Sequence, residues 1–536
     1  MALDPPPSQI DAGSAEGDGS RVRDASLNRR VFLWTVLNYG GKLCTLGTWF
    51  LLTPFMLQKL GPTEYGLWVL VSAVVAYSSL LDLGIGSAVT KYVAEHGARG
   101  SLDQVRGIVA TSVLLYAGLG LLAFAACALL APILPHLLQV SADLEPLATQ
   151  MTLVLGLSVG LAMPMTTAGA VLRGLQRYGV LNAMAVVQAL LTAAATVAVL
   201  LVGGGLLLMT ISHVIVTLCV QLVQVAVMHH IAPTLRPRLS DAQRTFIRPI
   251  STYTAPLFVT QLAGQLQSRS DGLVIGLMLP VSAVTPYAIA LKLSETPQIL
   301  TDQFMRVLMP LASEFDAQRD TNRLRVLFTT ATRLTLMISL PISLMMVFLG
   351  DWLLSAWVGA EYAVYAYLVT ILTIAILIDT LNWPAALILQ GMGCHHRLAP
   401  IAIGSGLANV VLSLLLVGPF GLAGVAMGTL IPTVIETTAF VIPYAMRTIG
   451  VRPLELLKDV LLPVVAPGVM MVIVLTVLRH YVSATTLLEI GSVGGVAGMI
   501  YLGTYLAIGA RGAERALVIS AVARVRQVFR PGTATA

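Results

Sequence analysis

The stretch LGPTEYGLWVLVSAVVAYSSLLDLGIGSAVTKY, residues 60–92, indicates the class of fold to which the chain belongs. Between Glu64 and Asp82 it carries no charged side chain. An α-helix needs about 20 predominantly apolar residues to cross the hydrocarbon core of a bilayer. The stretch therefore predicts a transmembrane helix near residues 66–85, and similar apolar runs occur on both sides of it.

The composition of the whole chain agrees with a membrane protein. The 536 residues are 57% hydrophobic and 11% charged, whereas soluble proteins carry about 25% charged residues. So few charges cannot cover a water-facing surface, and the chain is predicted to be an all-α polytopic membrane protein. The net charge of +6 fits basic cytoplasmic loops better than nucleic-acid binding.

Apolar run lengths predict fourteen transmembrane helices. They are expected near residues 31–57, 66–85, 107–133, 147–172, 180–202, 206–228, 249–279, 282–304, 326–350, 362–388, 398–416, 421–445, 459–478 and 485–509. The longest polar connection within this region, HHIAPTLRPRLSDAQRTFIRP at residues 229–249, separates the sixth helix from the seventh.

The basic residues predict the orientation of these helices. Of the 32 lysines and arginines, 26 fall on one side of the predicted membrane, and only Lys59 and Arg479 fall on the other. Because lysine and arginine accumulate in cytoplasmic loops, both termini are predicted to be cytoplasmic, which requires an even number of spans. The other four basic residues lie inside predicted spans, and they are Lys42, Arg269, Lys292 and Arg333.

The chain has the pattern of an internal repeat. The stretch MPMTTAGAVLRGLQRYGVLNAM at 163–184 resembles NWPAALILQGMGCHHRLAPIAI at 382–403, and the predicted first and seventh helices begin at a similar offset. Six helices per copy give both copies the same orientation, as in transporters whose lobes alternate access to a central site. The predicted parts are a disordered cytoplasmic tail (1–30), an N-terminal six-helix lobe (31–230), a cytoplasmic linker (231–248), a C-terminal six-helix lobe (249–446), two additional transmembrane helices (447–510) and a basic amphipathic cytoplasmic tail (511–536).

Two motifs connect the chain to a known family. These are the LGPTEYGLW…LLDLGIG…KY run at 60–92 and the segment SDGLVIGLMLPVSAVTPYAIALKLSE at 270–295. With the helix count and the repeat, they resemble bacterial polysaccharide flippases of the multidrug/oligosaccharidyl-lipid/polysaccharide exporter superfamily, over roughly residues 31–509. The two tails do not match a general pattern of that family.

The resemblance implies a flippase of the bacterial inner membrane. Such proteins move undecaprenyl-pyrophosphate-linked oligosaccharide units from the cytoplasmic to the periplasmic leaflet, by alternating access through a cationic central cavity. No cofactor is implied, but coupling to a proton or sodium gradient is suspected for the family. The implied partners are the lipid-linked oligosaccharide, the lipid bilayer, and polysaccharide polymerase and chain-length proteins, with no nucleic acid.

The polar side of the seventh predicted helix is the first candidate for a cavity wall. At 100° per residue, Gln261, Gln265 and Ser268 lie within about 60° of one another. Arg269 and Asp271 stand at opposite edges of this polar side, about 160° apart, so they cannot readily pair with each other. Each is therefore expected to find a separate partner on another helix, in water or on the cargo.

Lys42, Arg269 and Lys292 are the candidate ligands of a pyrophosphate group. All three are expected at similar depth, and a charge inside a span costs at least about 2.5 kcal/mol, so it normally faces a cavity or a partner. Arginine can donate two hydrogen bonds to phosphate oxygens. The alternatives are an i,i+3 pair between Lys292 and Glu295, and a structural ion pair for Arg269. Arg333, near a helix end, is expected to extend toward the membrane surface.

Asp271 and Asp379 are the candidate ion-coupling groups. A coupling group must be a carboxylate whose protonation or coordination changes with access to the two sides. No cluster with metal-ligand spacing, no nucleophile and base pair and no phosphate-binding loop was recognised in the sequence.

Three functions remain open on these observations. The flippase is favoured over a multidrug antiporter of the same superfamily because cationic drugs require an anionic cavity, whereas positive charge is prominent within the spans. A membrane glycan polymerase or ligase usually needs a large periplasmic loop, and the longest predicted ones, near 134–146, have only about 13 residues.

Overall fold

The computed structural model describes residues 16–305 and 307–510, and the regular elements of these ranges are all helical. Side chains are described within them except at 16–40, 42, 43, 79, 239, 253, 255–257, 259–261, 263, 266–269, 303, 304 and 395. Eleven helices of the described residues are long and apolar enough to cross a membrane. The predicted class of all-α polytopic membrane protein is therefore confirmed.

The first lobe contains seven helices and one short 3₁₀ segment. They are α1 (Glu16–Ala76), η1 (Tyr77–Asp82), α2 (Ile85–Ala98), α3 (Leu102–Leu130), α4 (Leu134–Leu137), α5 (Glu145–Gly174), α6 (Tyr178–Leu201) and α7 (Gly205–Ile231). Within this lobe α5 packs against both α3 and α7, and α6 packs against α1 and α7. Because α1 begins at Glu16, helix extends into the segment 1–30, for which the composition predicts disorder.

A turn inside α1 separates the first two predicted spans. Gly61 has φ 75° and ψ 171°, a backbone conformation outside the helical region. Glycine adopts a positive φ without the steric cost that a β-carbon would bring, and the following Pro62 cannot donate a backbone hydrogen bond. The sequence LGP at 60–62 therefore divides α1 into two helical parts, which correspond to the predicted spans at 31–57 and 66–85.

The connection between the lobes packs against the first lobe. It consists of η2 (Pro233–Leu235), η3 (Leu239–Asp241) and η4 (Arg244–Phe246). The backbone N–H of Gln243 donates to Thr111 Oγ1 at 3.1 Å. A β-carbon on Gly107 would lie 2.4 Å from the Phe246 ring, so the glycine lets this ring approach α3.

The second lobe and the two additional spans follow. The lobe contains α8 (Ile247–Met278), η5 (Val281–Ala283), α9 (Val284–Ser294), α10 (Thr296–Met305), α11 (Leu308–Ala317), α12 (Thr321–Val358), η6 (Ala360–Tyr365), α13 (Ala366–Gly391), α14 (His395–Phe420), α15 (Leu422–Ile435), the π-helical η7 (Glu436–Val441) and α16 (Ile442–Ile449). After it come α17 (Pro453–Leu456), η8 (Leu457–Leu461), α18 (Leu462–Tyr481), α19 (Leu487–Thr504) and η9 (Tyr505–Gly509).

The fourteen predicted spans correspond to these elements with two differences. The first two predicted spans fall on the two parts of α1, which the turn at Gly61 separates, and the predicted span at 282–304 consists of η5, α9 and α10. The predicted span at 249–279 is α8, whose sequence contains the polar residues of the QSRSDG stretch. The eleven apolar helices include neither α8 nor α9 and α10.

The lobes share one hydrophobic core at one end of the molecule. That core combines residues of α1, α4 and α5 with residues of α8, α9, α12 and α13. At the opposite end each lobe has a core of its own, formed in the first lobe around α2, α3 and α5 and in the second around α11, α12 and α13. In the predicted orientation, the shared core lies at the periplasmic end.

Direct contacts tie the lobes together at this shared core. Trp357 Nε1 donates to the carbonyl of Phe50 at 2.7 Å, and the two rings stack with their centroids 4.6 Å apart. Thr285 Oγ1 donates to the carbonyl of Pro62 at 2.6 Å. A β-carbon on Gly66 would lie 2.4 Å from the carbonyl oxygen of Val281, so α1 and η5 approach each other closely only because residue 66 is glycine.

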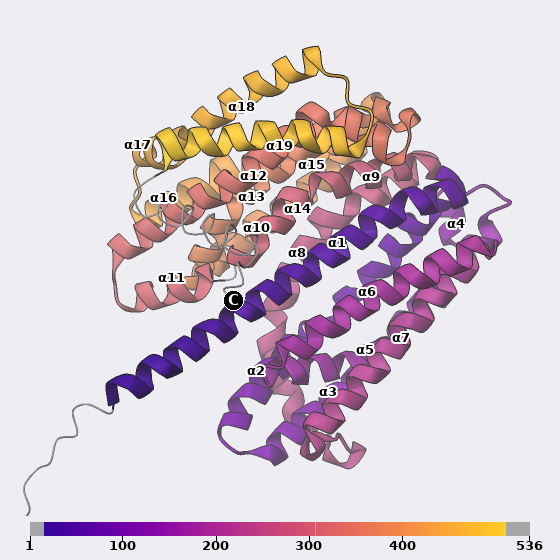
Figure 1. Ribbon diagram of the computed structural model, residues 1–536. Helices are drawn as coiled ribbons and strands as arrows, with labels where there is room; N and C mark the ends of the chain where they lie inside the picture. Colours follow the sequence, from indigo (N-terminus) through magenta and orange to yellow (C-terminus); the bar gives the residue numbers. More distant parts are fainter. Residues whose placement is uncertain (1–15, 306, 511–536) are drawn as a thin grey trace, which may run out of the picture.

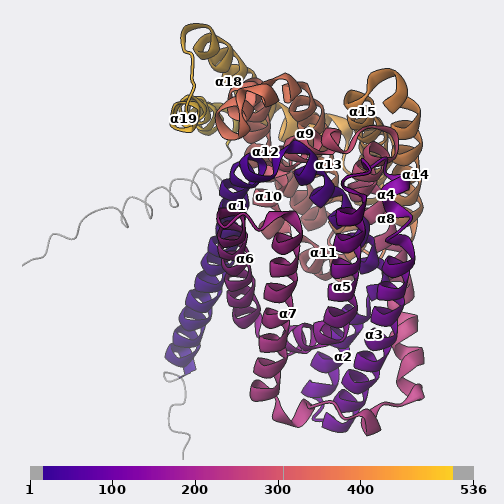
Figure 2. The same ribbon diagram turned by 90° about the vertical axis from the view of Figure 1, so that its right-hand side faces the viewer.

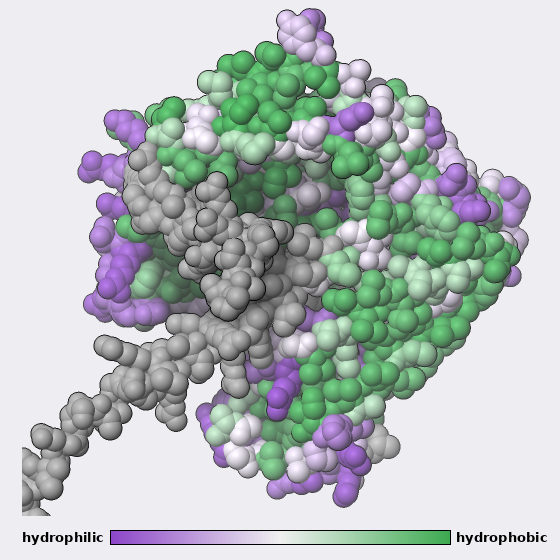
Figure 3. Space-filling view, in the orientation of Figure 1, coloured by the Kyte–Doolittle hydropathy of each residue, from purple (hydrophilic) through white to green (hydrophobic). Residues whose placement is uncertain are grey.

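The figures show how these elements are arranged. α1 runs between the helices of the first lobe and those of the second (Figure 1). Figure 2 shows α5, α6 and α7 running roughly parallel in the first lobe, while α18 and α19, which pack on α12, lie at the outer edge of the second. The surface over α6 and α7 is hydrophobic, and hydrophilic residues gather beyond both ends of it, as expected of a membrane-embedded face (Figure 3).

Candidate functional site

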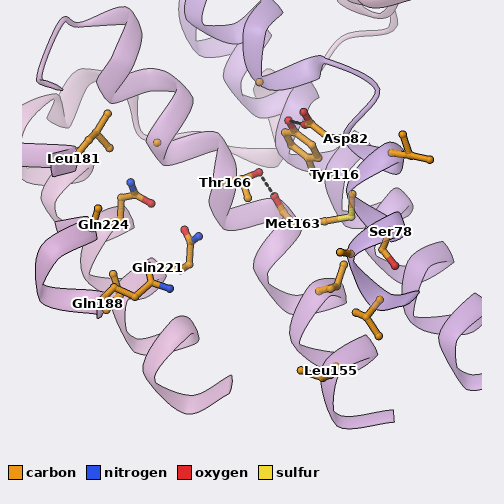
Figure 4. A pocket seen from close by; sticks show the side chains of 18 of the residues that line it. Ser78, Asp82, Tyr116, Leu155, Met163, Thr166, Leu181, Gln188, Gln221 and Gln224 are labelled. Carbon is orange, nitrogen blue, oxygen red and sulfur yellow. Dashed lines mark hydrogen bonds between the residues drawn. The ribbon is translucent and has the colours of Figure 1, made fainter. Parts of the chain in front are cut away.

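The first lobe encloses a cavity of about 1040 Å³. Its walls come from α1, η1, α2, α3, α5, α6 and α7, and Gly264 and Gln265 of α8 complete them. The polar side chains that line it are Ser72, Ser78, Asp82, Tyr116, Thr166, Arg173, Gln188, Gln221, Gln224 and Gln265. Figure 4 shows Asp82 and Tyr116 on one side of this cavity and Gln188, Gln221 and Gln224 on the other.

On one wall of the cavity, the carboxylate of Asp82 and the guanidinium of Arg173 both lie close to Gly86. The hydroxyl of Tyr116, which is 1% exposed, donates to Asp82 Oδ1. A β-carbon on Gly86 would lie 3.3 Å from the Tyr116 hydroxyl, 3.6 Å from an Arg173 guanidinium nitrogen and 3.9 Å from Asp82 Oδ1. The wall therefore carries one anion held by a phenol and one cation whose side chain is exposed to the cavity.

The opposite wall is lined with uncharged amides. Gln188 lies on α6, while Gln221 and Gln224, three residues apart, lie on the same face of α7. Gln265 of α8 adds a fourth amide. Each glutamine side chain offers two N–H donors and one carbonyl acceptor.

The three predicted pyrophosphate ligands do not meet in the described part of the structure. The side chains of Lys42 and Arg269 lie outside the described residues, as do those of Gln261 and Ser268. Lys292 Nζ lies 2.7 Å from Glu295 Oε2, the i,i+3 pair that the sequence offers as the alternative. Lys292 is not among the described residues that line the cavity, whereas Gln265 is.

Asp271 lies in a buried hydrogen-bond network of the second lobe. Its carboxylate is 5% exposed, and Oδ2 accepts from the Tyr287 hydroxyl at 2.5 Å and from Thr429 Oγ1 at 2.8 Å. The network continues from Thr429 to Asn409 Nδ2 at 2.9 Å and from Asn409 Oδ1 to Ser270 Oγ at 2.9 Å. Four helices, α8, α9, α14 and α15, thus meet around one membrane carboxylate.

The second predicted carboxylate, Asp379, lies on α13. Its Oδ2 accepts from Gln298 Nε2 of α10 at 3.1 Å. Glu436, which is 7% exposed, lies close enough for its charge to act on Asp379. Asp379 is thus one of two neighbouring acids in the interior of the second lobe, whereas Asp271 is surrounded by hydroxyl and amide groups.

Arg333 corrects an expectation about the membrane charges. The sequence predicts that its side chain extends to the membrane surface, but only 4% of the residue is exposed. Its Nη1 donates to the carbonyl of Asp459 at 3.2 Å. The guanidinium is buried because η8 passes over this part of α12, a tertiary contact that the position of Arg333 in its own helix does not reveal.

Sequence reasoning missed several of the cavity residues. Arg173 was counted as a loop cation because it ends an apolar run, and counting charges cannot distinguish a loop arginine from one that points back into a cavity. Gln188, Gln221 and Gln224 gave a usable signal. They are amides inside strongly apolar runs, and such residues normally face the interior of a helical bundle.

The sequence matches a known protein family over more than half of its length. Residues 58–367 match a family described as polysaccharide biosynthesis protein. The probable low-salt glycan biosynthesis flippase Agl15 of Haloferax volcanii is 19% identical over 190 residues, which are 35% of this chain and 40% of that relative. The chain thus spans less than half the length of the curated relative that it matches.

Solved structures share the fold at low sequence identity. The lipid II flippase MurJ in an inward closed conformation has a TM-score of 0.69 and 12% identity, with 89% of this chain and 99% of that chain covered. An inward-facing multidrug resistance MATE family transporter of the MOP superfamily has a TM-score of 0.63 and 14% identity, over 76% of this chain and 94% of that one. Since the family match covers more than half of the sequence, the chain belongs to the polysaccharide biosynthesis protein family, and its fold is that of these MOP-superfamily transporters.

Proposed function

We propose that the protein is a flippase that carries undecaprenyl-pyrophosphate-linked oligosaccharide units from the cytoplasmic to the periplasmic leaflet of the bacterial inner membrane. The observation that carries the proposal is the cavity of about 1040 Å³, which gathers charged and amide side chains between apolar helices of the first lobe. Charged and amide side chains inside a membrane are costly, and they are expected where a hydrophilic headgroup must pass the hydrocarbon core. Membership of a polysaccharide biosynthesis family and similarity to the probable glycan biosynthesis flippase of Haloferax volcanii support this cargo.

The shared core between the lobes supports alternating access as the mechanism. The lobes share a core at one end and have separate cores at the other. If the predicted orientation holds, with both termini in the cytoplasm, the protein is closed toward the periplasm. Transport then requires that the contacts between Trp357 and Phe50 and between Thr285 and Pro62 break while the cytoplasmic ends approach each other.

Positive charge is proposed to hold the pyrophosphate group. Arg173 supplies a guanidinium in the cavity wall, and a guanidinium can donate two parallel hydrogen bonds to phosphate oxygens. Lys42 and Arg269 remain proposed ligands from their positions in the sequence. Lys292 remains one as well, although its ammonium is held by Glu295 in this state and would have to exchange partners.

Ion coupling is proposed to act through the second lobe. Oδ1 of Asp271 is buried and accepts no hydrogen bond from the residues whose side chains are described, while Oδ2 accepts two hydrogen bonds. With the oxygens of Asn409 and Thr429 nearby, this group could take a proton or a sodium ion, and oxygen donors are the ligands that hard cations prefer. Asp379, beside Glu436, is the second proposed coupling group.

The alternative is a cation-coupled multidrug antiporter, which the buried acids of the second lobe would also serve. The two functions separate in cells that lack this gene. We expect loss of surface polysaccharide and accumulation of the lipid-linked unit on the cytoplasmic leaflet, with both restored by the wild-type chain. Unchanged polysaccharide together with a new sensitivity to cationic drugs would favour the antiporter and overturn the flippase.

Charge replacement tests the cationic cavity separately. The export of polysaccharide is compared at equal protein level between wild type and four variants, Arg173→Ala, Lys42→Ala, Arg269→Ala and Lys292→Ala. Loss of export is expected when a phosphate ligand is removed. Normal export by all four variants would contradict a role for these cations.

A further inference from the structure

The amide wall of the cavity does not belong to the phosphate or ion chemistry described above. We infer that Gln188, Gln221 and Gln224 bind the sugar part of the cargo and so select which glycan the protein carries. This inference rests on the proposed flippase function and assigns a separate task to the wall opposite Asp82 and Tyr116.

The amide wall is the end of a longer polar stripe on α7. His213, Thr217, Gln221 and Gln224 follow one another at helical spacing, so they lie on one face of the helix. The stripe faces α6, where His213 Nε2 lies 2.6 Å from Thr196 Oγ1 and Thr217 Oγ1 accepts from Gln188 Nε2 at 3.4 Å. Hydrogen bonds between helices therefore occupy the first half of the stripe, and the second half lines the cavity.

In the second half of the stripe, Gln221 has an acceptor that points to a ligand, and Gln224 lies beside it against a glycine of α5. Gln221 Oε1 is buried and accepts no hydrogen bond from the described residues. Buried acceptors without partners are rare, because each loses its hydration without a replacement. The side chain of Gln224 fits beneath Gly169 of α5, where an added β-carbon would lie 3.1 Å from its Nε2. The bare glycine thus leaves room for this amide beside the cavity.

The chemistry of the wall fits sugar hydroxyls. A sugar ring presents neighbouring hydroxyl groups that each donate and accept, and a primary amide can do both at once. The wall is uncharged, whereas the opposite wall holds the cavity's aspartate and arginine. A volume of about 1040 Å³ lies at the upper limit of small-molecule pockets, which run to about 1,000 Å³, and has room for several sugar rings.

Binding to the purified full-length chain tests this assignment with two lipid probes. One is undecaprenyl pyrophosphate without sugar, and the other is undecaprenyl pyrophosphate that carries the oligosaccharide isolated from the producing cells. The double variant Gln188→Leu, Gln221→Leu should bind the sugar-bearing probe at least about tenfold more weakly than wild type, since it removes amide contacts to hydroxyls. Its affinity for the sugar-free probe should stay within about twofold of the wild-type value.

Control variants separate recognition from loss of structure. Gln390→Leu makes the same substitution in α13, away from the cavity, and should change neither affinity. Gln221→Met keeps the approximate size of the side chain and adds no charge, but it removes the amide donors and acceptor, so it should weaken binding of the sugar-bearing probe alone.

Three results have distinct meanings. If the glutamine variants bind both probes equally more weakly, or bind both as tightly as wild type, the sugar assignment is overturned while the flippase proposal stands. Failure of the wild-type chain to bind either probe would instead contradict the proposed function itself.

Discussion

At the residue scale, the two motifs of the sequence place their polar residues in two different networks. Asp82 of LLDLGIG accepts from Tyr116 beside the cavity, and Asp271 of the second motif accepts from Tyr287 and Thr429. Sequence reasoning identified Asp271 as a membrane carboxylate in need of partners. It could not name them, because Tyr287, Thr429 and Asn409 come from three other helices whose packing is a tertiary property.

Asp271 is expected to be required for coupling and not for folding. Asp271→Asn keeps the shape of the side chain and its acceptor for Tyr287, but it cannot gain and lose a proton or offer a negative charge to a cation. We expect the ion-gradient dependence of transport to disappear, with a rate at least about tenfold lower. Tyr287→Phe, which removes one hydrogen bond worth about 1 kcal/mol, should reduce the rate less. Undiminished gradient-dependent transport by Asp271→Asn would refute the coupling role.

Lys292 is expected to contribute little to export unless it leaves Glu295 during transport. Its side chain is 49% exposed, and an exposed pair of this kind is worth about 0–1 kcal/mol. If the pair persists through the cycle, Lys292→Met should lower export less than about fivefold, measured as surface polysaccharide at equal protein level. A loss as large as that of Arg173→Ala would show that Lys292 also meets the cargo.

At the element scale, the LGPTEYG motif has two structural roles, the turn at Gly61 and the close helix contact at Gly66. Gly61 in this motif separates the two helical parts of α1. Gly66, at the start of the second part, lets the backbone of α1 approach the backbone of η5. The predicted spans at 31–57 and 66–85 fall on the two sides of the turn at Gly61, while the helical residues before position 31 were not expected. Run length locates apolar segments, whereas the extent of a helix beyond the membrane depends on hydrogen bonds that continue through polar residues.

Gly66→Ala should weaken the contact between α1 and η5 in the shared core of the two lobes. The new methyl group would meet the carbonyl oxygen of Val281 at 2.4 Å, and overpacking of this kind costs about 1–3 kcal/mol. Spin labels at positions 59 and 361 should therefore report a larger share of long distances, and the melting temperature should fall. Gly47→Ala is the matched control on the same helix, because nothing lies within 4 Å of its added β-carbon. Identical distance distributions for the two variants would contradict the proposed role of this contact.

At the scale of the whole molecule, composition and run length were sufficient to predict an all-α membrane protein. Apolar runs of about 20 residues are long enough to cross a bilayer as α-helices, and an α-helix satisfies its backbone hydrogen bonds within the segment. The position of the cavity could not be predicted in the same way. It is bounded by six helices and the 3₁₀ segment η1 of one lobe and by the first helix of the next. Its arginine, Arg173, lies at a position for which the sequence predicts a loop.

The proposed flippase predicts a specific movement of lipid in a defined membrane. The measurement uses proteoliposomes that contain the purified full-length chain and undecaprenyl pyrophosphate bearing the oligosaccharide of the producing cells. An enzyme added outside that modifies the sugar reports the fraction of the lipid accessible in the outer leaflet over time. The account predicts that this fraction rises above that of protein-free vesicles under an imposed proton or sodium gradient, and that Arg173→Ala slows the rise. The same time course in protein-free and protein-containing vesicles would contradict the central claim.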